Sequence, residues 1–157
     1  MSADHRRLIR RAIELAWSAH QSGNHPFGAL LAAADGTILH EAENSVGTTG
    51  DCTGHAETNL MRSASRRFPR KTLAAATLYS SAEPCAMCAG AIYWGGVGQV
   101  VYGLSERELL MLTGANPENP TLDLPCREVF ARGQRPLRVI GPLLEEEARA
   151  VHEGFWD

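Results

Sequence analysis

Hydrophobic and polar residues follow two different rhythms along this chain, one typical of helices and one typical of strands. Apolar residues recur every three or four positions over residues 4–22, which predicts an amphipathic helix. Two short apolar runs follow, at residues 27–33 and 37–42, and Asp35-Gly36 separates them. Because Asp-Gly between apolar runs is a strong hairpin signal, these runs predict two antiparallel strands.

Helical and strand patterns alternate through the rest of the chain, which indicates the α/β class. The expected elements are a helix from Thr53 or Gly54 to Phe68, a strand at 75–81, a helix at 84–94, a strand at 97–103, a helix at 105–112, a strand at 136–140 and a helix at 143–155. A helix between two strands forms a crossover, so the strands at 97–103 and 136–140 should run parallel.

Length and composition narrow the class of protein. The 157 residues predict a single domain, residues 1–157, with a full hydrophobic core. A net charge of −3 gives no overall attraction to nucleic acid. The start lacks an apolar run suited to a signal peptide, and no stretch approaches the roughly 20 apolar residues of a membrane span. Four cysteines without a disulfide pattern favour a reducing cytoplasm.

The candidate chemistry lies in two short clusters, His55-Ala56-Glu57 and Glu83-Pro84-Cys85-Ala86-Met87-Cys88. Cys85 and Cys88 are three residues apart, so a helix places both sulfurs on one face. Pro84 suits the first turn of that helix, whose dipole favours thiolates. Two thiolates and the imidazole of His55 are zinc ligands, and three protein donors leave the fourth position of a catalytic zinc open to water.

Glu57 supplies the proton transfer that such a site needs. Zinc lowers the pKa of a bound water from about 15.7 to about 7. Glu57 is close enough in sequence to His55 to take the proton of that water without ligating the metal. The alternative is a closed structural zinc with Cys52 as a fourth ligand, as in a non-catalytic binding module. That alternative leaves Glu57 and Pro84 without a role.

The spacing His-x-Glu followed by Pro-Cys-x-x-Cys matches the signature of zinc nucleobase deaminases. Over roughly positions 5 to 105 the sequence resembles the cytidine and deoxycytidylate deaminase superfamily, in its guanine deaminase and tRNA adenosine deaminase branches. The resemblance implies a three-layer α/β/α fold with helices on both faces of a mixed five-stranded sheet, whose strands 4 and 5 are parallel. It also implies Zn²⁺ as cofactor, a homodimer, and hydrolysis in which Glu57 protonates the ring nitrogen and ammonia leaves.

The same resemblance suggests substrate contacts. Asn44 matches an asparagine that hydrogen-bonds the base, although turn chemistry explains an Asn after a strand equally well. The backbone N–H of Ala56 is implied to contact a ring carbonyl. Phe27 lies in Pro26-Phe27-Gly28-Ala29, which resembles the start of the first strand in guanine deaminases, and Gly28 would let the backbone approach the site. Trp156 belongs to an aromatic tail that could dock on its own core or on a partner subunit and cover the site.

A free guanine-like base is the favoured substrate, on the residues around Phe27 and on Ile92-Tyr93-Trp94, where Trp94 is expected to pack in the core. A tRNA substrate is disfavoured by the acidic balance of the chain and of its last helix. Residues 114–125, with three prolines, match none of these branches and predict a rigid loop over the pocket. Such a loop, through Glu118, Asn119 or Asp123, could shift specificity to adenine, cytosine, a pterin or a triazine. Cys126 is expected to be a free buried thiol.

Overall fold

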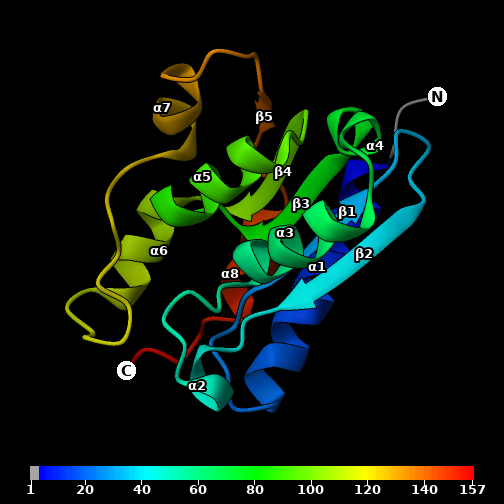
Figure 1. Cartoon of the computed structure of the whole chain (residues 1–157). Coiled ribbons are helices and arrows are strands. Elements are labelled where there is room, and N and C mark those ends of the chain that lie inside the picture. The colour runs from blue at the N-terminus through cyan, green and yellow to red at the C-terminus, as the bar shows by residue number, and fades with distance from the viewer. Residues whose placement is uncertain (1–3) are drawn as a thin grey trace.

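A mixed sheet forms the centre of the computed structural model, which describes residues 4–157 (Figure 1). Its strands are β1 (Gly28–Ala32), β2 (Ile38–Glu43), β3 (Thr77–Ala82), β4 (Gln99–Leu104) and β5 (Arg138–Ile140), in the order β2-β1-β3-β4-β5. β1 runs antiparallel to β2 and β3, whereas β4 runs parallel to β3 and β5. The predicted five-stranded sheet with parallel fourth and fifth strands is confirmed.

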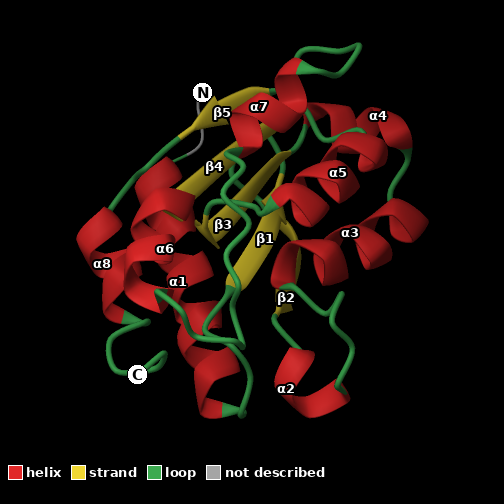
Figure 2. Ribbon diagram, turned by 90° about the vertical axis from the view of Figure 1, so that its left-hand side faces the viewer, coloured by secondary structure: helices red, strands yellow, loops and turns green. Residues whose placement is uncertain are grey.

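Helices cover both faces of this sheet. They are α1 (His5–Gln21), α2 (Val46–Thr49), α3 (Ala56–Arg67), α4 (Arg70–Ala75), α5 (Ala86–Gly95), α6 (Glu106–Thr113), α7 (Cys126–Ala131) and α8 (Glu145–Ala150). Figure 2 shows α3, α4, α5 and α7 on one side of the strands and α1, α6 and α8 on the other, which confirms the three-layer prediction. None of the helices within residues 4–157 is long and apolar enough to cross a lipid bilayer.

Burial of both sheet faces explains the apolar strand sequences. Leu31 belongs to the core that α3 and α5 cover, whereas its neighbour Leu30 belongs to the core beneath α1. Successive side chains of a strand point to opposite faces, so a strand buried on both sides reads as a continuous apolar run. α1 places its buried stripe on the sheet, and the side chain of Asp4 caps its first turn.

Several elements differ from the sequence-based expectation. The short helices α2, α4 and α7 were not expected, and the last helix is limited to Glu145–Ala150 because the chain then turns to bury Trp156. The expected core position of Trp94 is wrong, since its side chain is 77% exposed. α5 buries Cys88, Ala89 and Ile92 against its neighbours, so a residue two positions after Ile92 points away from them.

The close backbone approach expected at Gly28 is made to a helix rather than to the site. A Cβ atom at Gly28 would lie 2.5 Å from the Ala12 carbonyl oxygen and 2.5 Å from Leu15 Cβ, both on α1. Real Cβ atoms do not come this close to other atoms, so glycine is needed for α1 to pack on β1.

Candidate active site

The metal-binding candidates are brought together by the N-termini of α3 and α5. His55 is the N-cap residue of α3, and Cys85 is the N-cap residue of α5. Pro84 was expected in the first turn, but α5 begins at Ala86, one residue after Cys85. Cys85 and Cys88 therefore occupy the N-cap and N3 positions, whose side chains face each other as they do in a capping box.

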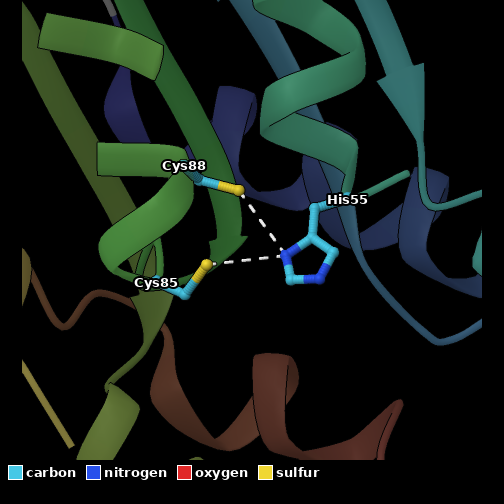
Figure 3. A group of neighbouring side chains, drawn as sticks. All are labelled: His55, Cys85 and Cys88. Atoms are coloured by element: carbon cyan, nitrogen blue, oxygen red, sulfur yellow. Dashed lines mark hydrogen bonds between the residues drawn. The ribbon is translucent and has the colours of Figure 1, made fainter. Parts of the chain in front are cut away.

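The three donor atoms lie at distances that suit one zinc ion. Nδ1 of His55 is 3.5 Å from Cys85 Sγ and 3.6 Å from Cys88 Sγ, and all three atoms lie within 4.8 Å of one another. Figure 3 shows both sulfurs pointing toward this nitrogen. Tetrahedral zinc with sulfur at about 2.3 Å and nitrogen at about 2.0 to 2.1 Å places such a pair of donors about 3.6 Å apart. The donor set and its spacing therefore fit zinc.

Electrostatics at this point favour ionised sulfur. A hydrogen bond from the Cys88 thiol lowers the pKa of Cys85 to about 4, and His55 acts in the same direction. The hydrogen bond with Cys85 in turn raises the pKa of His55. The hydrogen bond from the Cys88 thiol to Cys85, together with burial, raises the pKa of Cys88, so a bound cation is needed for both sulfurs to ionise. The Thr58 hydroxyl lies 3.2 Å from Cys88 Sγ and can donate to that sulfur.

Glu57 lies beside these donors and is nearly enclosed. It occupies the first turn of α3, its side chain is 6% exposed, and it lines the same cavity as His55 and Cys85. Burial raises the pKa of Glu57 to about 7; the negative charge at Cys85 adds to this rise, and His55 opposes it. A carboxyl group with a pKa near neutrality can both take up and release a proton, which suits a general acid–base role.

Cys52 lies outside the group of donors. Within the described residues, the cluster that can hold a metal consists of His55, Cys85 and Cys88, while Cys52 is an exposed free thiol. This arrangement favours the three-donor site with an open fourth position over the closed site with four protein ligands. The expected free, buried state of Cys126 is confirmed.

A cavity of about 330 Å³ opens over the donors. It is lined by His25, Phe27, Asn44, Val46, Cys52, His55, Glu57, Glu83, Cys85, Glu106, Leu109, Glu118, Asn119, Pro120, Thr121 and Leu122. Four of these residues are glutamates, and no lysine or arginine lines the cavity in the part of the chain that the structure describes. The proline-rich loop covers part of the cavity as expected, through Glu118 and Asn119, whereas Asp123 is not among the lining residues.

Asn44 and Phe27 are both placed at the cavity wall. The Asn44 backbone N–H donates to the Phe27 carbonyl at 3.1 Å, which holds the two residues side by side. Oδ1 of Asn44 accepts from the Val46 N–H at 3.0 Å, as in an Asx turn. Its amide nitrogen has no partner among the described residues, so Asn44 shapes the turn and still presents a donor to the cavity.

The two other predicted contacts do not line the cavity. Ala56 is fully buried as the first residue of α3, and its N–H belongs to the first turn, where no intrahelical acceptor exists. Trp156 is 5% exposed and lies behind the wall, with its ring 6.2 Å from Phe27 and 5.1 Å from His25 between centroids. The aromatic tail thus docks on its own chain, and the Asn116 amide donates to the Trp156 carbonyl at 2.7 Å.

Two acidic residues of the site were not assigned a role from the sequence. Both oxygens of Glu83 accept backbone N–H groups at 2.9 Å, one from Glu106 and one from Cys126, so Glu83 ties together the segments around the cavity. Glu106 falls within the helix expected at residues 105–112, and no role in the site was predicted for it. Its place directly after β4 was the available signal, because ligands of α/β sheets bind at the carboxyl ends of strands.

Fold and metal site together define a zinc-dependent deaminase. Residues 2–104 match the family model described as the cytidine and deoxycytidylate deaminase zinc-binding region. The chain belongs to this family, whose enzymes are hydrolases acting on C–N bonds, and zinc is the cofactor of its His/Cys/Cys centre.

The relatives within this family differ in the substrates in their names. The chain is 39% identical over 149 residues to the probable cytosine deaminase of Schizosaccharomyces pombe, covering 95% of this chain and 90% of that protein. It is 40% identical over 100 residues to the guanine deaminase of Bacillus subtilis, covering 63% of this chain and 64% of the relative. The fold is similar to that of the guanine deaminase of Nitrosomonas europaea, with a TM-score of 0.79 at 24% identity, covering 99% of this chain and 85% of that one.

Proposed function

We propose that this protein removes the amino group of a free nucleobase by zinc-dependent hydrolysis and releases it as ammonia. The observation that carries this proposal is the composition of the cavity wall above the zinc donors. The wall contains four glutamates and, among the described residues, no lysine or arginine. A nucleotide or a tRNA anticodon would bring phosphate groups close to these carboxylates without a cationic side chain to offset the repulsion, whereas a neutral base avoids this cost.

Each residue of the site has a role in this proposal. His55, Cys85 and Cys88 hold the zinc ion, which supplies the Lewis acidity that makes a water molecule a nucleophile at neutral pH. Glu57 takes one proton from that water and delivers it to the ring nitrogen. It then takes the remaining proton of the added hydroxyl group and delivers it to the amine, which leaves as ammonia while the carbonyl forms. Asn44 and Phe27 position the base, the first through its free amide and the second through its ring. The buried setting strengthens these contacts because it excludes water.

Two bases are candidates for the substrate. The residues around Phe27 and the run Ile92-Tyr93-Trp94 favour a guanine-like purine. Cytosine is the second candidate, because the similarity to the probable cytosine deaminase extends over 95% of this chain and so includes the loop at 114–125. That loop borders the cavity, which makes it a natural determinant of the base that fits.

An ammonia-release assay tests the proposal. Zinc-loaded enzyme is incubated with guanine, cytosine and adenine, with the matching nucleosides, and with nucleoside monophosphates. We expect turnover of one free base and none of the monophosphates. The Glu57→Gln variant should keep its zinc and lose activity by about two to four orders of magnitude, the range of general acid–base catalysis. Glu128→Gln, an exposed carboxylate on α7, is the matched control. Normal turnover by Glu57→Gln, or a preference for phosphorylated substrates, would contradict the proposal.

We further propose that the protein forms a homodimer through α5. Trp94 is 77% exposed and Met87 is 38% exposed on this helix, and large exposed apolar side chains that share one helix favour an interface. Light scattering should give twice the chain mass for the wild type and the chain mass for Trp94→Glu. A monomeric wild type would contradict this proposal and leave the assignment of the reaction unaffected.

A further inference from the structure

Glu106 places a second carboxyl group at the cavity, beside the catalytic one. It is the first residue of α6 and follows the end of β4, next to the end of β3 that leads to the metal-binding motif. Its side chain is 5% exposed, and it lines the cavity together with Glu57 and Asn44. The residue is thus nearly enclosed by protein and borders the space that a substrate would occupy.

The carboxyl group of Glu106 has no partner within the described chain. Its Oε2 atom is buried and makes no hydrogen bond there, and the cavity wall offers no lysine or arginine. Enclosing an unpaired carboxyl group costs free energy, so native proteins leave such groups mainly where a ligand or a function requires them. The carboxyl group of Glu106 can therefore accept a hydrogen bond from a bound ligand.

The structural link made by this residue does not involve its carboxyl group. The backbone N–H of Glu106 donates to Glu83 at 2.9 Å, and the Ser105 hydroxyl accepts from the Glu108 N–H to cap the helix. Both bonds survive a change of the Glu106 side chain. These bonds therefore do not account for the carboxyl group, although its place in the first turn of α6 favours a negative charge there.

We propose that Glu106 is a substrate-binding residue whose carboxyl group accepts a hydrogen bond from a ring N–H of the heterocycle. The enzyme then selects bases that carry such a ring N–H in addition to the amino group that is removed. This inference rests on the proposed function and adds to it a specificity-determining contact. A site built to pair with an N–H discriminates strongly against analogues that lack it, because its own polar group is then left unpaired.

Kinetics of matched variants test this contact. The zinc-loaded wild type is compared with Glu106→Met, which keeps the length of the side chain but removes the acceptor, and with Glu106→Gln, which keeps one neutral acceptor oxygen. Glu128→Met, at an exposed position, is the control. With the best free base, we expect kcat/KM to fall roughly ten- to a hundredfold in Glu106→Met, mainly through KM, and by less in Glu106→Gln. The control should match the wild type.

Methylated bases then identify the ring N–H that donates to Glu106. The substrate is assayed as a series of derivatives, each with one ring N–H replaced by N-methyl. For one derivative the wild type and Glu106→Met should have equal kcat/KM, because the N–H that donates to Glu106 has been replaced. The effects of the methyl group and of the substitution are then not additive, which identifies a direct contact. A constant ratio between the two enzymes for every derivative would overturn the inference.

Binding and stability separate this inference from the proposed function. Titration calorimetry measures the affinity for 8-azaguanine and for cytosine. This affinity should be lower in Glu106→Met than in the wild type, even if no base is turned over. Unchanged affinity, or no binding to the wild type, overturns the inference. The melting temperature of ligand-free Glu106→Met should equal or exceed that of the wild type, since an unpaired buried carboxyl group has been removed. A melting temperature clearly below that of the control would assign Glu106 a structural role instead.

Discussion

Replacing His152 by glutamine should reduce the loss of stability that we expect for this protein on acidification. The imidazole is 2% exposed, and its Nδ1 atom accepts a hydrogen bond from the Trp156 indole at 3.1 Å. The neutral ring therefore carries its proton on Nε2, and protonation of Nδ1 would set two N–H groups against each other. Burial lowers the pKa of His152 to about 4.

The size of the effect follows from the two pKa values. In the unfolded chain a histidine titrates near pH 6.5, so between about pH 6.5 and pH 4 the unfolded state binds a proton that the folded state does not. Stability therefore falls as the pH drops through this window. The full contribution is about 3 kcal/mol, and about 2 kcal/mol of it lies between pH 7 and pH 5.

Urea unfolding of the wild type and of His152→Gln at pH 8, 7, 6 and 5 measures this contribution. Glutamine can still accept from Trp156 but does not titrate, so the decrease in unfolding free energy from pH 7 to pH 5 should be about 2 kcal/mol smaller in the variant. The values at pH 8 serve as the internal reference. Equal decreases in the two proteins would refute the assignment of His152 as a neutral, buried ring.

Two further changes test the packing of β1 and the metal site. Gly28→Ala should lower the unfolding free energy by about 1 to 3 kcal/mol, because the new Cβ meets the Ala12 carbonyl. Gly90→Ala should raise it by about 0.5 to 1 kcal/mol, because Gly90 lies in α5 with open space around it. Thermal unfolding measures both changes. Cys52→Ser should retain one zinc per chain by elemental analysis, while Cys85→Ser should lose it, and zinc loss from the Cys52 variant would revive the closed site.

The sheet and the metal donors were predictable because their signals are local. The hairpin around Asp35-Gly36 and the crossover before β5 follow from short sequence patterns, and the order of the strands agrees with both. His55, Cys85 and Cys88 lie in two motifs whose spacing reflects the start of a helix. A motif of this kind identifies its donors whatever the rest of the chain does.

The remaining features depend on contacts between distant segments. Glu106 joins the site only because β4 pairs with β3 in parallel, so that both strand ends reach one cavity. Its place after a strand could be seen in the sequence, but this pairing could not. The exposure of Trp94 depends on which side of α5 meets the sheet. Gly28 is required by the packing of α1, because Ala12 and Leu15 of that helix lie where a side chain at this position would be. Short helices such as α7 contain too few residues for a helical period to be recognised.

X-ray absorption at the zinc edge of the purified enzyme tests the metal site most directly, because it counts the donor atoms around the ion. The geometry at His55, Cys85 and Cys88 predicts two sulfur donors at about 2.3 Å and two light donors near 2.0 to 2.1 Å, one an imidazole nitrogen and one a water oxygen. Three sulfur donors, as in a closed site that includes Cys52, or a protein that binds no zinc, would contradict the account.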